Sequence, residues 1–126
     1  MKLTGIDHIV LTVRDVPATI TFYESILGMQ REAFGEGRIA LKFGQQKINL
    51  HQHQKEFEPK ADKATPGSAD LCFISDMPLA WALEQVKKSG IEIIDGPVNR
   101  TGANGPIISF YIRDPDQNLI EISNYV

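Results

Sequence analysis

The sequence predicts an α+β fold built from two βαβββ modules. Each half of the chain reads as one strand, one helix and three further strands. In each half an Asp-X-Pro triplet precedes the helix and a glycine follows it, from Asp15 to Gly28 and from Asp76 to Gly90. A polar stretch with two prolines, residues 54–67, separates the halves. Two copies of one supersecondary unit usually pair into one structure, so we expect a single domain over the whole chain.

The first module is predicted over residues 4–53. Residues 6–13 are rich in β-branched side chains and favour a strand. Asp15 is expected to cap the following helix, Pro17 fits its first turn, and Gly28 ends it. Three short strands punctuated by glycines are expected next, at about residues 30–34, 38–43 and 47–52.

The second module is predicted over residues 68–126 in the same order. Residues 69–75 favour a strand, and Asp76-Met77-Pro78 repeats the helix start of the first module. Gly90 is expected to end this helix. Three more strands are expected, at about residues 91–94, 107–113 and 118–125, with a loop at residues 102–106.

The composition narrows the classes of function. With 126 residues, a net charge of −3 and no basic cluster, the chain does not favour a nucleic-acid surface. The single Cys72 excludes an internal disulfide, and its apolar neighbours predict a reduced, buried thiol. No apolar run approaches the roughly 18 residues of a membrane span, and no signal peptide is evident. We therefore expect a cytoplasmic protein that binds neither nucleic acid nor membrane.

The last predicted strand carries an acid among apolar residues. Leu119, Glu121 and Ser123 face one side of this strand, and two isoleucines face the other. A buried carboxylate without a partner is costly. The sequence therefore predicts a cation, a hydrogen-bond network or a proton beside Glu121, unless this strand lies at a solvent-exposed edge.

The repeat relates other polar residues to Glu121. Aligning the two Asp-X-Pro triplets, with one residue deleted in the second copy, sets His8 opposite Asp70. Aligning the two final strands sets Asn49 opposite Glu121. His51 then lies two residues further along the same strand face.

These side chains have the chemistry of a metal site. The four candidate ligands are His8, His51, Asp70 and Glu121. Imidazole nitrogens and carboxylate oxygens together suit Zn, Ni, Co, Mn or Fe(II). His53 competes with His51, which lies nearer the apolar part of the strand. Asp70 is the weakest candidate, because an aspartate at a strand start is commonly exposed. Histidines satisfied by hydrogen bonds, and charges in solvent, are the alternative interpretation.

Several motifs carry a resemblance to a known family. They are Asp7-His8-Ile9-Val10-Leu11-Thr12-Val13, Phe22-Tyr23-Glu24 with Leu27-Gly28-Met29, and Phe110-Tyr111-Ile112-Arg113-Asp114-Pro115-Asp116 with Leu119-Ile120-Glu121. Together they resemble the vicinal oxygen chelate superfamily of glyoxalase I, bleomycin resistance proteins and extradiol dioxygenases. Four further stretches resemble its glyoxalase domain-containing protein 5 branch, which includes bacterial virulence proteins: Gln46–His51, Glu56–Lys60, Gly67–Cys72 and Gly96–Gly102. Gln117 replaces the glycine that usually follows Asp-Pro-Asp.

The resemblance implies that the two modules form a cup-shaped mixed sheet, with a divalent metal held on their first and last strands. His8 matches the first-strand histidine, and Glu121 matches the last-strand glutamate. Asp70 stands where many members have a second histidine. The fourth strand offers either Asn49 or His51.

The shared chemistry of the superfamily implies a metal-dependent, glyoxalase-like lyase or isomerase acting on a small oxygen-rich substrate. Glu121 is then the candidate proton acceptor. Ser109, Tyr111 and Arg113 share one strand face and are candidates to contact the substrate. The segment at residues 55–63 either covers the mouth of the cup or only joins the modules.

Three other functions stay open. They are a metal-free, ligand-sequestering module of the bleomycin resistance type, an extradiol-type dioxygenase and an inactive structural dimer. Members commonly pair their modules across subunits, which implies a homodimer.

Overall fold

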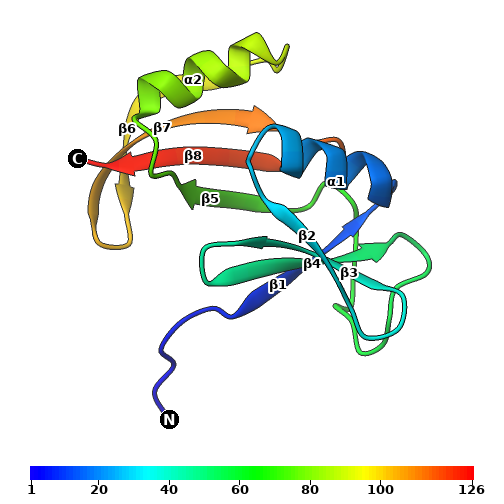
Figure 1. The fold of residues 1–126 in the computed structure, drawn as a ribbon. Coiled ribbons are helices and arrows are strands. Elements are labelled where there is room, and N and C mark those ends of the chain that lie inside the picture. Colours follow the sequence, from blue (N-terminus) through cyan, green and yellow to red (C-terminus); the bar gives the residue numbers. More distant parts are fainter. The chain divides into compact units, whose positions relative to one another are not determined.

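The computed structural model describes residues 1–126, which divide into two compact units, Met1–Gly67 and Ser68–Val126. Each unit contains one helix and one four-stranded mixed sheet (Figure 1). The element order β-α-β-β-β occurs twice, so the α+β class and the two βαβββ modules are confirmed. Neither helix is long and apolar enough to cross a membrane.

The first unit contains strands β1 to β4 and helix α1. Their bounds are β1 His8–Val13, α1 Val16–Ser25, β2 Gln30–Phe34, β3 Arg38–Phe43 and β4 Gln46–Gln52. The sheet order is β1-β4-β3-β2, and only β1 and β4 are parallel. Asp15 caps α1 as predicted, since its side chain accepts a 3.0 Å hydrogen bond from the Ala18 backbone N–H. Gly28 follows the helix with a φ of 67°, a conformation that favours glycine.

Alternation along its strands gives the first sheet one apolar and one polar face. Helix α1 packs against β2, β3 and β4. The buried apolar residues on this side are Leu11, Val13, Ile20, Tyr23, Leu41, Ile48 and Leu50. The register pairs His8 with Lys47 and Thr12 with His51, so these side chains share the opposite face.

The second unit repeats this arrangement. Its bounds are β5 Asp70–Ile74, α2 Leu79–Lys88, β6 Asp95–Gly102, β7 Gly105–Arg113 and β8 Leu119–Tyr125. The sheet order is β5-β8-β7-β6, again with only the first pair parallel. Helix α2 packs against β7 and β8. The buried apolar residues of this unit are Leu79, Ala82, Val86, Ile107, Phe110, Ile112, Ile120 and Ile122.

The start of α2 differs from the prediction. Pro78 is the N-cap residue and makes no side-chain cap, so Asp76 does not repeat the role of Asp15. Asn124 of β8 supplies the cap instead, because its Oδ1 accepts a 2.7 Å hydrogen bond from the Leu79 backbone N–H. The capping residue is distant in sequence, so no local motif could reveal it.

The prediction of a strand at residues 91–94 is wrong, because β6 runs over residues 95–102. A glycine–proline pair, which is typical of a turn, lies inside this strand at an irregularity of its register. Gly96 has a φ of 101°, and a Cβ there would lie 2.5 Å from the carbonyl oxygen of Ser109, so only glycine fits. The loop predicted at residues 102–106 shrinks to a tight hairpin between β6 and β7.

Candidate functional site

The predicted site residues lie on the polar faces of the two sheets. The first unit carries His8, Asn49 and His51, and the second carries Asp70, Ser109, Tyr111, Arg113 and Glu121. Neither unit brings together three or more His, Cys, Asp or Glu side chains that could hold a metal ion.

The strand register makes the two faces equivalent. Val10 of β1 pairs with Asn49 of β4, and Cys72 of β5 pairs with Glu121 of β8. This register agrees with the alignment made from the sequence. The position of the acid in the second unit is thus taken by an amide in the first, and His51 lies two residues further along the same strand face.

His8 is held by its neighbour in sequence. Its Nδ1 lies 2.8 Å from Asp7 Oδ2, and its side chain is 44% exposed. A carboxylate can only accept, so Nδ1 carries a proton, and in the neutral form of the ring Nε2 then keeps its lone pair. This hydrogen bond also lowers the pKa of Asp7. A histidine oriented by a carboxylate in this way is typical of a metal ligand.

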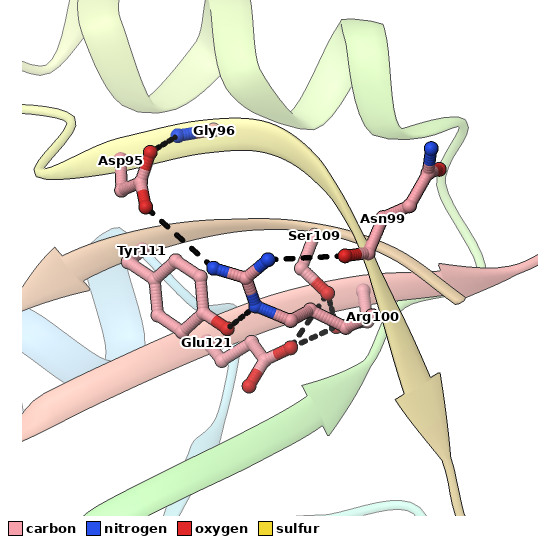
Figure 2. A network of polar contacts seen from close by, with 8 residues as sticks. Asp95, Gly96, Asn99, Arg100, Ser109, Tyr111 and Glu121 are labelled. Carbon is pink, nitrogen blue, oxygen red and sulfur yellow. Dashed lines mark hydrogen bonds and ion pairs between the residues drawn. The ribbon is translucent and has the colours of Figure 1, made fainter. Parts of the chain in front are cut away.

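Glu121 lies in a chain of hydroxyl groups (Figure 2). Ser109 Oγ donates a 2.6 Å hydrogen bond to Glu121 Oε2, and Ser123 Oγ lies 2.6 Å from Ser109 Oγ. A longer contact of 3.4 Å joins Ser123 Oγ to the same Oε2. Both hydroxyls meet Oε2, which leaves Oε1 without a serine partner. The hydrogen-bond network predicted for this acid is present.

Tyr111 is paired with an arginine that the sequence prediction missed. Arg100 Nε of β6 donates a 3.0 Å hydrogen bond to Tyr111 Oη, and Arg100 Nη2 lies 3.7 Å from Asp95 Oδ2 (Figure 2). Burial raises the pKa of Tyr111, and the bond from Arg100 partly offsets this effect. Arg113 is exposed at the end of β7 and contacts the Gln117 carbonyl at 3.3 Å. Arg113 is therefore not part of this network.

The prediction of a buried Cys72 is wrong, because the residue is exposed. Its apolar neighbours in β5 point to the opposite face of the sheet, since side chains alternate along a strand. Cys72 Sγ lies 3.2 Å from Ser123 Oγ. Partial burial is still the main cause that raises the pKa of the thiol, and the charge of Glu121 raises it further.

His51 is buried, with 3% of its surface exposed. Arg38 Nη2 lies 3.4 Å from His51 Nε2, and the ring of Phe57 makes an edge contact with the imidazole at 5.6 Å between centroids. A guanidinium can only donate, so Nε2 must accept. Burial lowers the pKa of His51, and the positive charge of Arg38 lowers it further.

The donors fit a divalent metal in part. His8 Nε2 and Glu121 Oε1 each have a lone pair available, and each side chain is oriented by a hydrogen bond at its other atom. Asn49 Oδ1 is buried and accepts no hydrogen bond, so it also has lone pairs to offer. Asp70 is exposed at the start of β5. His51 fits least well, because Nε2 faces a permanent cation.

The turn before β8 fixes the position of Glu121. Asp114 Oδ1 accepts hydrogen bonds from the backbone N–H groups of Asp116 and Asn118, at 2.9 and 3.0 Å. Asn118 Oδ1 accepts a 2.8 Å bond from the Ala69 backbone N–H, which ties this turn to the beginning of β5. The Asp-Pro-Asp motif is thus a structural element that aligns β8.

Sequence reasoning missed Arg38, Phe57 and Arg100. Arg38 lies on a strand and Phe57 in a loop distant in sequence. No spacing in the sequence predicts a contact between them. Arg100 lay outside the predicted strands, so its face could not be assigned. The only sequence feature that pointed to Arg100 was its place in the stretch Gly96–Gly102, which carries part of the family resemblance.

The fold and these two faces define a glyoxalase-like domain, and comparison with known proteins supports this class. The family profile described as Glyoxalase/Bleomycin resistance protein/Dioxygenase superfamily matches residues 5–122. The chain belongs to this superfamily. It is 58% identical, over 100% of its length and 88% of the relative's length, to virulence protein STM3117 of Salmonella typhimurium. It is 54% identical to glyoxalase domain-containing protein RDO1 of Mycosarcoma maydis, over 99% of this chain and 70% of that protein.

Solved structures show the same fold. The crystal structure of the Salmonella protein superimposes with a TM-score of 0.99, with 100% of both chains covered. More distant in sequence are a lactoylglutathione lyase from Agrobacterium tumefaciens (23% identity, TM-score 0.75) and TnmS3, an antibiotic binding protein from a Streptomyces species (20% identity, TM-score 0.78). Each of these two alignments covers at least 95% of both chains. At this level of identity, these two likenesses show the fold alone.

Proposed function

We propose that the chain is a metal-dependent, glyoxalase-like enzyme of the lyase or isomerase type, acting on a small oxygen-rich substrate. The observation that carries this proposal is that the side chains of His8 and Glu121 are each held in orientation by a hydrogen bond. Each is oriented by a hydrogen bond at one atom, to Asp7 and from Ser109, and each keeps a lone pair at its other atom. Side chains that serve only as surface charges need no such support.

His8 and Glu121 would hold a divalent transition metal, with Asp70, Asn49 and His51 as further candidates. When bound, such a metal acts as a Lewis acid toward neighbouring oxygens of a substrate. His8 belongs to the first module and Glu121 to the second.

The chain's own residues would supply the remaining chemistry. Glu121 is the candidate proton acceptor, and Ser109 and Ser123 hold its Oε2 in place. Tyr111, whose Oη accepts a hydrogen bond from Arg100, is the candidate to contact a substrate oxygen.

The second candidate function is a metal-free module that binds and sequesters a small molecule. The contact between Arg38 and His51 favours it, because a cation beside the imidazole opposes metal binding there. The antibiotic-binding TnmS3 shows that this fold can serve binding.

Turnover assays with added metals separate the two candidates. Compounds with two neighbouring oxygens, including hemithioacetals of glutathione, would be assayed after chelation and after addition of Zn, Ni, Co, Mn or Fe(II). Turnover that needs a metal and disappears in Glu121→Gln supports the enzyme. Compound binding that is the same with and without metal, and no turnover with any ion, supports the binding module.

We also propose that the protein is a cytoplasmic homodimer. Pairing of modules between subunits would cover the polar sheet faces, on which Val10 and Ile74 are 45% and 54% exposed. Light scattering coupled to gel filtration tests the dimer. Cell fractionation tests the location.

A further inference from the structure

Arg38 carries a positive charge into an aromatic environment. Its guanidinium carbon lies over the ring of Phe34 at 5.0 Å and over the ring of Phe57 at 4.8 Å. Phe34 comes from β2 and Phe57 from the segment that follows β4, so Arg38 joins these two parts of the first unit. Two aromatic faces stabilise a cation, but they do not supply hydrogen-bond acceptors.

The guanidinium also forms no ion pair. No carboxylate of the chain forms an ion pair with Arg38, whereas Arg31 and Arg100 are each paired with an acid. The only hydrogen-bond partner of Arg38 is the neutral His51, at 3.4 Å from Nη2. Arg38 Nε is buried and has no partner. A buried N–H donor on a charged group is costly when nothing accepts its hydrogen bond.

Two buried acceptors without partners belong to the same unit as this donor. Asn49 is two residues before His51 on β4, so its side chain lies on the same sheet face, and its Oδ1 is buried without a hydrogen bond. Glu56 belongs to the segment that carries Phe57, and its Oε2 is also buried without a partner. The sheet face that carries His51 thus holds an unused donor on Arg38 and an unused acceptor on Asn49, and Glu56 adds a carboxylate whose charge acts on His51.

We propose that this face is a binding subsite for a small hydroxylated oxyanion, with Arg38 receiving the carboxylate or phosphate group. Arg38 Nε–H would donate to the oxyanion, and a hydroxyl of the same molecule would donate to Asn49 Oδ1. His51 holds the guanidinium in place and acts as a positioning residue. Phe57 contacts both His51 and Arg38, so the segment after β4 forms one wall of the subsite.

If the chain is the proposed enzyme, this subsite predicts that its substrate carries a carboxylate or phosphate group beside a hydroxyl. Only this statement about the substrate rests on the proposed function. The binding event itself needs no metal. A test in chelator-treated protein therefore separates the subsite from the metal site.

The test is a titration of the isotope-labelled protein, followed by NMR at Arg38 Nε–H and the His51 ring. The probes are glycolate, acetate and inorganic phosphate. We expect saturable shifts at both residues with glycolate or phosphate, and weaker binding of acetate, which lacks the hydroxyl group. Tighter binding of glycolate than of phosphate assigns a carboxylate, and the reverse order assigns a phosphate.

Variants test the role of the charge. Arg38→Gln should weaken binding by about 10- to 100-fold, and Arg38→Lys should weaken it less, because a charge remains. The matched control is Arg31→Gln, an exposed arginine paired with Glu24 on the same unit, which should bind as the wild type does. A wild-type titration that leaves Arg38 and His51 unshifted would overturn the proposal whether or not the variants fold. Equal affinity in Arg38→Gln and the wild type would overturn it as well.

Discussion

Ser109 donates a 2.6 Å hydrogen bond to the carboxylate of Glu121 across β7 and β8. Ser109 is fully buried, and its hydroxyl also contacts Ser123. The sequence prediction placed Ser109 among the substrate contacts. The structure supports another role, in which Ser109 orients the acid and keeps its second oxygen available.

Replacing Ser109 by alanine should therefore weaken metal binding without unfolding the protein. Loss of a group that orients a ligand typically costs about 10- to 100-fold in metal affinity. The measurement is calorimetric titration of chelator-treated protein with Zn, Ni or Co, with Ser25→Ala as a control on an exposed residue of α1. Wild-type affinity in Ser109→Ala would show that the serine does not support a metal ligand.

Asn124 is expected to be a stability residue. It caps α2 at Leu79 and donates to the carbonyl groups of Ser75 and Met77. Asn124→Ala should lower the free energy of unfolding by about 2–3 kcal/mol, because several partners lose their hydrogen bonds together. Urea denaturation measures this change.

Asp76→Ala is the control for this prediction. Asp76 is exposed and was the cap expected from the sequence, but it makes no cap in the structure. Its replacement should change the free energy of unfolding by less than about 0.5 kcal/mol. A larger loss in Asp76→Ala than in Asn124→Ala would refute the observed cap.

Gln117 stores backbone strain in the turn before β8. Its φ is 71°, in the left-handed region that disfavours side chains with a Cβ. Gln117→Gly should raise the free energy of unfolding by about 1 kcal/mol. The bond from Arg113 goes to the backbone carbonyl and should remain. Gln117→Ala keeps the Cβ, so thermal unfolding of that variant should show no comparable gain.

The features predicted well from the sequence are those that depend on local rules. Asp15 caps α1 through a side chain three residues from its partner, and alternation alone places Glu121 on a face with Ser123. The repeat gave the element order of both units, because each copy repeats the same punctuation by aspartate, proline and glycine.

The features that could not be predicted depend on contacts between distant residues. Asn124 caps a helix that begins 45 residues earlier, and Phe57 reaches Arg38 from a segment without regular structure. Cys72 was misjudged for a different reason. Its apolar neighbours were read as a buried environment, although alternation turns them to the opposite face.

The thiol of Cys72 provides a pH-dependent test of the second unit. Its pKa is raised, first by burial and then by the charge of Glu121. Only the thiolate reacts with iodoacetamide, so alkylation of the folded, chelator-treated protein should reach its half-maximal rate at a higher pH than alkylation in urea.

Glu121→Gln removes one of the charges that raise this pKa. The half-maximal pH of alkylation in the folded protein should therefore fall in this variant. An identical pH profile in folded and urea-unfolded wild type would contradict the environment described for Cys72. Because the chain contains one cysteine, the reaction reports on this site alone.

The most direct test of the central claim is elemental analysis of the purified protein. The wild type would be compared with His8→Ala, Glu121→Gln and the control Glu84→Gln, which changes an exposed residue of α2. We expect about one equivalent of a transition metal per chain in the wild type and the control, and loss of the metal in the other two variants. Absence of metal from all four proteins, even after incubation with Ni, Co, Mn, Zn and Fe(II), would contradict the metal-dependent function.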